Sequence, residues 1–185
     1  MGDDTKEAPE GGYEVTLTSV DKLTREEIAT CIDVVVEGKA VPRWAAQTGV
    51  PQAARLALVR CNGEIVGVGV IKGPNVQHAR TVAEEHKHGF PETTPELGYA
   101  SVRQAHRNNH LSSRIFEKLL SGTDEPLYAV TSEEKMKHLL GKHGFVERGI
   151  TTKGRRGDAL SITGHLCCFS DQPVADIVQC GEPAF

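Results

Sequence analysis

The chain has 185 residues, of which 38% are hydrophobic and 25% are charged, and its formal net charge is −4. This length suits one domain with a complete core, and the composition excludes an intrinsically disordered chain. No stretch approaches the roughly 18–20 apolar residues that span a bilayer, and the negative charge argues against a general nucleic-acid binder. We therefore expect a soluble protein whose partner is neither a membrane nor a nucleic acid.

The two ends of the chain and its cysteines indicate a cytoplasmic protein with one domain. Residues 1–12 are acidic and polar, unlike a signal peptide, and we expect a flexible tail there. The domain is predicted over residues 13–170, followed by a C-terminal extension over 171–185. The cysteines are odd in number and lack CxxC spacing, so reduced structural thiols are expected. They are Cys31, Cys61, Cys167, Cys168 and Cys180.

The N-terminal part of the chain predicts a strand and two helices. Residues 13–19 alternate in polarity and are rich in β-branched residues, as in a strand. Thr24 and Glu27 form a capping box, which predicts a helix that runs to about Glu37. A second, short helix is expected over residues 42–47.

A β-hairpin is predicted next. Residues 56–60 and 64–71 are apolar runs joined through Asn62-Gly63, which is the strongest short-range hairpin signal. Gly67 and Gly69 lie inside the second run and not after it, so they do not form a dinucleotide-binding fingerprint. We interpret them as marking a bulge or the close approach of a helix.

The rest of the chain alternates helices and strands. Residues 72–95 are mostly polar, and we expect a long excursion there with a helical turn around 80–88. The further elements expected are a strand over 96–102, a helix over 111–120, a strand over 126–131, a helix from 132 to 144, and strands over 145–150 and 160–169. This order predicts an α+β sandwich, with helices on both faces of a sheet of mixed strand direction.

Residues 102–113 link a strand to a helix and carry the most informative motif. Successive backbone N–H groups at such a turn form a cradle, and the helix dipole adds partial positive charge. Both features favour a bound pyrophosphate.

The run from Val102 to Leu120 resembles the acetyl-CoA-binding motif of the GNAT superfamily of N-acetyltransferases. In that motif a strand leads through R-x-x-G-x-G/A into a helix that ends in a leucine pair. Arg107 stands at the basic position, whereas His110 replaces the first glycine and Ser112 replaces the second small residue.

Two further segments resemble the same superfamily in the same order. Residues 133–145 are similar to its fourth helix, which closes in a Gly-Phe pair, and the hairpin over 56–71 is similar to its second and third strands. The resemblance covers most of residues 13–169. It implies a mixed, mostly antiparallel sheet with helices on both faces.

The resemblance also implies an activity: an amine attacks the thioester of acetyl-CoA directly in a ternary complex, and no metal takes part. The acceptor would be a small-molecule amine or a protein amine. Dimers are common in the family, so the resemblance also implies a possible homodimer. The expected contacts to acetyl-CoA come from the strand residues Ala100, Ser101 and Val102 and from Arg107, Asn108, Asn109, His110, Leu111, Ser112 and Ser113.

Three residues are candidates for the proton transfers of this reaction. Glu96 occupies a place comparable to that of the family's base. Leu140 stands where the family carries its acidic tyrosine, so Tyr99 and Tyr128 are the candidates for the acid. The alternatives are a strand-end carboxylate paired with a surface base for Glu96, and packing roles for the two tyrosines.

Two other features have competing interpretations. Trp44 lies in the region that shapes the acceptor pocket of the family, but a core tryptophan under the second helix is the interpretation that we favour. His86 and His88 could flank a metal, but no third ligand with suitable spacing accompanies them.

The altered glycine positions leave a second function open, namely a catalytically weak GNAT-fold protein that binds or senses acyl-CoA. A weaker alternative is the acylation of a nucleic acid or nucleotide, which rests only on the basic residues near Arg103 and Arg155.

Overall fold

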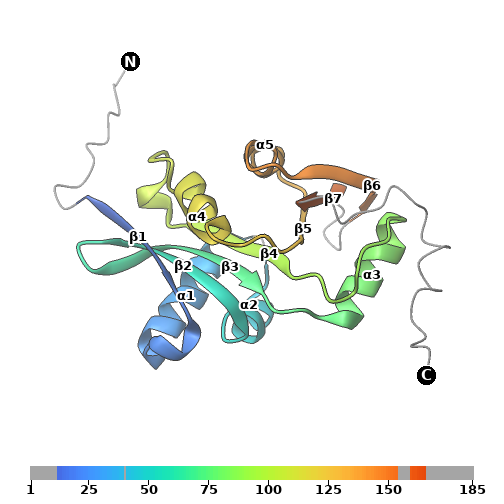
Figure 1. Ribbon diagram of the computed structural model, residues 1–185. Coiled ribbons are helices and arrows are strands. Elements are labelled where there is room, and N and C mark those ends of the chain that lie inside the picture. Colours follow the sequence, from blue (N-terminus) through green and yellow to red (C-terminus); the bar gives the residue numbers. More distant parts are fainter. Residues whose placement is uncertain (1–11, 40, 154–158, 166–185) are drawn as a thin grey trace, which may run out of the picture. The chain divides into compact units, whose positions relative to one another are not determined.

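The computed structural model describes residues 12–39, 41–153 and 159–165 (Figure 1). These residues form two compact units, one built from residues 12–39, 41–72 and 99–121 and the other from 73–98, 122–153 and 159–165. The predicted C-terminal extension, nearly all of the predicted tail and Cys167, Cys168 and Cys180 lie outside the described residues. Cys31 and Cys61 are free and buried, and burial raises the pKa of the Cys31 thiol to about 12.

The first unit contains three antiparallel strands in the order β1-β2-β3, with the last part of β4 beside β3. Its helices confirm the predicted ones to within a few residues. The elements are β1 (Tyr13–Thr18), the 3-10 turn η1 (Val20–Lys22), α1 (Arg25–Glu37), α2 (Arg43–Gly49), β2 (Ala53–Cys61), β3 (Glu64–Lys72), the 3-10 turn η2 (Gln104–His106), α4 (Leu111–Leu120) and the end of β4 (Glu96–Val102).

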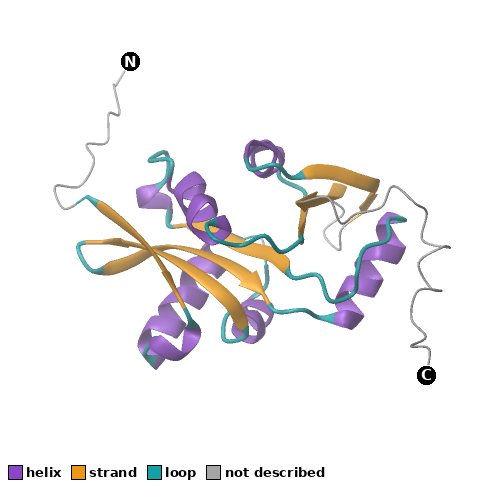
Figure 2. Ribbon diagram, in the orientation of Figure 1, coloured by secondary structure: helices purple, strands orange, loops and turns teal. Residues whose placement is uncertain are grey.

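Local sequence signals produce the local structure in this unit. The capping box is formed, because Thr24 Oγ1 accepts from the Glu27 N–H at 3.1 Å and Glu27 Oε2 accepts from the Thr24 N–H at 2.9 Å. The short loop between β2 and β3 (Figure 2) places Asn62 at φ 51° and Gly63 at φ 85°. Both residues are therefore left-handed, as a tight hairpin turn requires.

The sheet of this unit buries both faces, since α1 and α2 lie on one side of it and α4 on the other (Figure 1). Val68 and Val70 of β3 pack with the apolar side of α1. Because neighbouring strand residues point to opposite faces, Gly69 points toward α4. A Cβ atom there would lie 2.1 Å from Ile115 Cγ2, so glycine allows α4 to approach the strand. The predicted close helix packing is confirmed.

Substitution of Gly69 by alanine should destabilise the protein by about 1–3 kcal/mol, because the added methyl group has no space against Ile115. Gly141→Ala is the matched control, since nothing lies within 4 Å of a Cβ atom built at that helical position. We expect the control to be neutral or stabilising by about 0.5–1 kcal/mol. Urea unfolding measures both changes, and equal stability of the two variants would contradict the close packing.

The second unit contains strands in the order β4-β5-β7-β6. The β4–β5 pair is parallel, and the β5–β7 and β6–β7 pairs are antiparallel. The described residues of the two units together contain seven strands, whose directions are mixed and mostly antiparallel, as predicted. The elements are α3 (Val76–His86), the start of β4, β5 (Leu127–Thr131), α5 (Glu134–Lys142), β6 (Val146–Lys153) and β7 (Ala159–His165).

Helix α3 is longer than the single turn that the sequence predicted within residues 72–95. Its buried residues are Ala79, Val82, Ala83 and His86, of which only Val82 is a branched apolar residue, so the buried stripe carries little apolar bulk. The imidazole of His86 can be buried because its Nδ1 atom has a hydrogen-bond partner, the Ile150 carbonyl oxygen, at 2.8 Å. Within the described ranges no group of three or more His, Cys, Asp or Glu residues could hold a metal ion. No helix in those ranges is long and apolar enough to cross a bilayer.

Candidate functional site

The candidate site begins where β4 ends, in the first unit. Val102 is buried, and the next residue, Arg103, donates its backbone N–H to the Val66 carbonyl at 2.8 Å. The chain then passes through η2 and turns into α4. Two residues of this turn have left-handed backbones, Asn108 at φ 68° and His110 at φ 55°. The loop therefore reverses direction sharply before the helix begins.

His110 shows why the resembling motif carries glycine at this position. Its φ of 55° and ψ of 19° lie in the region that glycine adopts without steric cost. Histidine is among the residues enriched there, and the His110 side chain is exposed. The backbone thus keeps the conformation that the motif needs although the glycine is absent.

The first turn of α4 presents backbone donors. The N–H groups at the start of a helix have no partner within it, and here these belong to Leu111, Ser112 and Ser113. The first intrahelical bond runs from the Arg114 N–H to the His110 carbonyl at 3.3 Å. The side chain of His110, the N-cap residue, makes no capping hydrogen bond. Such donors and the helix dipole are the features that favour an anion, and the binding of one at this turn stays a prediction.

The loop is held from β1 by a network that the sequence did not reveal. Asn109 Nδ2 donates to Tyr13 Oη at 3.2 Å and to the His106 carbonyl at 3.1 Å. The Tyr13 hydroxyl also lies 3.2 Å from His106 Nδ1, and Arg114 donates to the Tyr13 carbonyl at 2.8 Å. Burial raises the pKa of the Tyr13 hydroxyl, with a smaller contribution from Cys61. Tyr13 stands about 90 residues before its partners, so only the tertiary structure identifies it.

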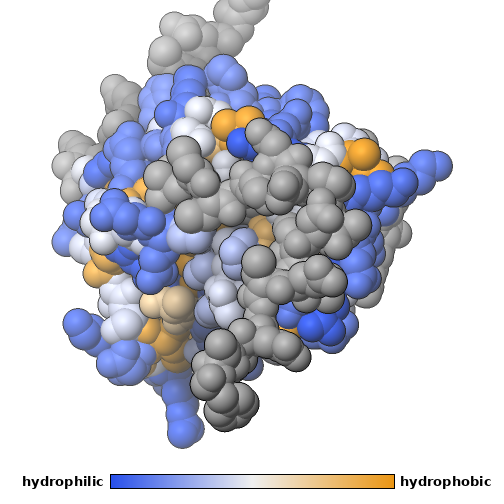
Figure 3. Space-filling model, turned by 45° about the vertical axis from the view of Figure 1, so that its right-hand side comes forward, coloured by the Kyte–Doolittle hydropathy of each residue, from blue (hydrophilic) through white to orange (hydrophobic). Residues whose placement is uncertain are grey.

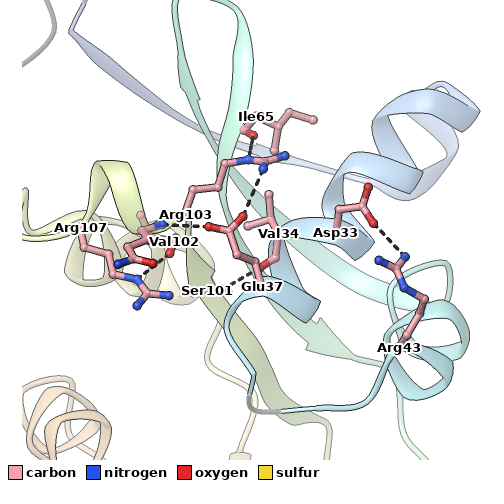
Figure 4. A network of polar contacts seen from close by, with 10 residues as sticks. Asp33, Val34, Glu37, Arg43, Ile65, Ser101, Val102, Arg103 and Arg107 are labelled. Carbon is pink, nitrogen blue, oxygen red and sulfur yellow. Dashed lines mark hydrogen bonds and ion pairs between the residues drawn. The ribbon is translucent and has the colours of Figure 1, made fainter.

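The end of α1 holds the start of the same loop (Figure 4). Glu37 accepts from the Gln104 N–H at 3.0 Å and from Arg103 Nη1 at 3.2 Å. The hydroxyl of Ser101 donates to the Val34 carbonyl at 2.8 Å. The carboxylate of Glu37 therefore fixes the point where β4 passes into η2. Sequence reasoning treated Glu37 only as the end of a helix and missed this contact.

Arg107, the basic residue of the motif, points back along the loop. Its Nε atom donates to the Val102 carbonyl at 3.0 Å, which Figure 4 shows. The residue is exposed. The Nε donor of the guanidinium thus closes the loop, and a role of its other donors in binding a ligand stays a prediction.

Tyr99 contacts helix α2, and Trp44 is a residue of that helix. Tyr99 lies in β4 with a φ of 53°, and its hydroxyl donates to the Ala45 carbonyl of α2 at 3.0 Å. Lys72 Nζ lies 4.2 Å from the centroid of its ring. This arrangement gives Tyr99 a structural contact, and its role as an acid stays a prediction. Trp44 is 63% exposed, so the core interpretation is wrong.

Glu96 and Tyr128 come together in the second unit. They are opposite each other in the parallel register of β4 and β5. The Glu96 side chain is 12% exposed, and its Oε2 lies 3.4 Å from His78 Nε2. Tyr128 is buried with its ring centroid 4.7 Å from that of Phe90. Burial and the nearby Glu96 carboxylate raise the pKa of Tyr128, which therefore remains a neutral phenol.

The surface of the described residues is largely hydrophilic on the face in Figure 3, with small separate hydrophobic areas. The exposed large hydrophobic residues are Leu17, Trp44, Val76, Val146 and Ile150. A groove of about 510 Å³ opens in the first unit between the start of α1, the β2–β3 hairpin and η2. Its lining includes the ion pair of Arg60 and Glu27.

No protein-family model and no curated protein sequence matches the chain. Solved structures are similar in fold. An acyl-CoA N-acyltransferase from Pseudomonas aeruginosa superposes with a TM-score of 0.63 at 15% identity, over 84% of this chain and 100% of that one. ElaA from Escherichia coli gives 0.63 at 13% identity, over 84% and 100%.

A third structure is a GNAT-family acetyltransferase from Elizabethkingia anophelis with acetyl-CoA bound. It superposes with a TM-score of 0.55 at 13% identity, over 83% of this chain and 97% of that one. At such identities the similarity establishes architecture. The chain has the GNAT fold, and the predicted fold class is confirmed.

The left-handed backbone at His110 predicts how the loop responds to substitution. His110→Val should destabilise the protein by about 1–2 kcal/mol, because a β-branched residue is strained at this φ. His110→Gly should change stability by less than about 1 kcal/mol, since the relief of strain is offset by the greater entropy of the unfolded chain. Urea unfolding of both variants tests this, and a fully stable valine variant would contradict the left-handed loop.

Proposed function

We propose that the protein is an N-acyltransferase that moves an acetyl or other acyl group from acetyl-CoA to a primary amine. The observation that carries this proposal is the first turn of α4, where donors without a side-chain cap follow a left-handed loop in a GNAT fold. A cytoplasmic location and a homodimer stay predictions.

The cosubstrate would be held by two successive segments of the first unit. The diphosphate would accept hydrogen bonds from the N–H groups of Leu111, Ser112 and Ser113, with Arg107 adding positive charge. Asn108, Asn109 and His110 would shape the same cradle. The pantetheine arm would lie along the backbone amides of Ala100, Ser101 and Val102. The support for this placement is the pair of contacts that Glu37 and Ser101 make, which fix that strand end.

The reaction requires a neutral amine, a stabilised oxyanion and a departing thiolate. Glu96 is proposed as the base that removes the amine proton. Tyr128 is proposed to donate a hydrogen bond to the thiolate, and Tyr99 remains a candidate for the same task. The pKa of a tyrosine already lies above that of a thiol, and burial raises the pKa of Tyr128 further, so a hydrogen bond to the thiolate is more favourable there than complete proton transfer.

The acceptor would be a small-molecule amine or an exposed protein amine. An indole that is 63% exposed on α2 offers an apolar and π-rich surface to a cationic amine before deprotonation. The neighbouring side chain, Arg43, forms an ion pair with Asp33 at 2.8 Å. We therefore propose Trp44, and not Arg43, as the contact for the acceptor.

Ser112→Asp tests the diphosphate cradle. A carboxylate in the first turn suits the helix dipole but repels a diphosphate, so acetyl-CoA affinity should fall by about tenfold or more while the fold persists. Gln77→Asp is the matched control, because Gln77 is the second residue of α3 as Ser112 is of α4. Calorimetry measures binding, and release of free thiol with a panel of amines measures turnover.

Three results of these assays have different meanings. Binding with turnover that Ser112→Asp abolishes supports the transferase. Tight binding without turnover across the amine panel favours the catalytically weak acyl-CoA-binding protein. No binding at millimolar acetyl-CoA, or equal loss in the Gln77→Asp control, contradicts the cradle at α4.

Trp44→Ala should raise the KM for the amine by about fivefold or more, which corresponds to roughly 1 kcal/mol of lost contact. Acetyl-CoA affinity should be unchanged, since Trp44 lies on α2 and not in the α4 loop. Val146→Ala is the control, because it truncates another exposed hydrophobic residue. An unchanged KM in the Trp44 variant would remove this residue from the acceptor site.

A further inference from the structure

His78 faces the proposed base and has no part in the chemistry above. It lies in the first turn of α3, where its backbone N–H donates to Asn75 Oδ1 at 3.0 Å. The following residue, Ala79, is buried in the core of the second unit. The backbone of His78 is therefore fixed from both sides, and its side chain is held at the start of the helix.

The imidazole connects a mostly buried carboxylate to the solvent. His78 Nε2 lies 3.4 Å from Glu96 Oε2, and the two side chains are 47% and 12% exposed, respectively. A carboxylic acid so little exposed exchanges its proton with water less readily than a surface group does. The imidazole is a contact through which a proton on Glu96 can reach the solvent.

One neighbouring ion pair in this unit involves neither His78 nor Glu96. Arg80, two residues further along α3, binds both carboxylate oxygens of Glu92, with distances of 2.8 and 3.0 Å. This bond raises the pKa of Arg80 and lowers that of Glu92. Tyr128, opposite Glu96, is a neutral phenol. The contact between His78 and Glu96 is thus separate from the Arg80–Glu92 pair.

We propose that His78 is a positioning residue that orients Glu96 and carries its proton to the solvent. This inference rests on the proposed function. The structural alternative is a surface ion pair, which would contribute little to stability and nothing to turnover. The two cases differ in kcat.

Two protons leave the acceptor nitrogen over one turnover. The relay carries the first of them, and the second leaves the tetrahedral intermediate as the C–S bond breaks and goes to the departing thiolate, so that coenzyme A leaves as a thiol. Glu96 takes a proton from the acceptor ammonium, whose electron pair stays on nitrogen and attacks the thioester carbonyl. The new carboxylic acid passes its proton to the lone pair on His78 Nε2. The imidazolium then releases its Nδ1 proton to water, which restores the carboxylate and leaves a neutral imidazole with its proton on Nε2. Proton exchange of this imidazole with water moves the proton back to Nδ1 and restores the Nε2 lone pair for the next turnover.

Chemical rescue tests the relay. His78→Ala should lower kcat by about tenfold or more and leave the KM for acetyl-CoA unchanged, because only the proton path is lost. Added imidazole should restore part of the activity, since the site is half open to the solvent. His138→Ala, which removes another exposed histidine, on α5, is the control and should keep full activity. A kcat within twofold of the parent, or no rescue, would overturn the relay.

A second measurement does not depend on turnover. With 15N-labelled histidine at one fixed pH, Glu96→Gln should shift the His78 Nε2 resonance, whereas Glu92→Gln should not. An unshifted resonance in the Glu96 variant overturns the relay and leaves the proposed function intact. Absence of turnover in the parent protein with every amine tried overturns both.

Discussion

The backbone amides at the start of α4 are the feature on which the proposed chemistry depends, and they must stay open without the helix fraying. Helices usually satisfy these donors with the side chain of the N-cap residue, but His110 makes no such bond. Residues outside the helix hold the loop before it in place instead. Tyr13 and Glu37, from β1 and α1, hold the loop through its side chains and its first residues. The donors therefore remain available to an anion although their positions are fixed.

Two glycines allow helices to lie close to the sheet of the first unit. Gly69 removes a side chain so that α4 can lie against the strand, and Gly38 does so beside Ser101, whose Oγ would be 2.5 Å from a Cβ atom there. Close packing of this kind transmits the position of the sheet to the loop. This packing supports the loop from the sheet and α1, which the proposed diphosphate cradle requires.

The second unit differs from the first because it wholly or mostly buries two groups that can carry a proton, Tyr128 and Glu96. Tyr128 is enclosed with Phe90, and Glu96 is nearly enclosed beside it. Burial favours the neutral form of Tyr128 and raises the pKa of its hydroxyl. A base in such a place needs a route for its proton, and His78 is the group that provides one. The contact between Glu96 and His78 is therefore the structural feature on which the proposed proton path depends.

Local signals in the sequence determined most of the elements, because a capping box, an Asn-Gly turn and alternating polarity act within a few residues of each other. They also placed the α4 loop, including the position of His110. The outcome was different wherever a residue's surroundings come from distant segments. Helix α3, the exposure of Trp44, and the contacts of Tyr13 and Glu37 with the loop follow from packing between segments up to 96 residues apart. Such contacts leave no short-range pattern, and only the tertiary structure decided them.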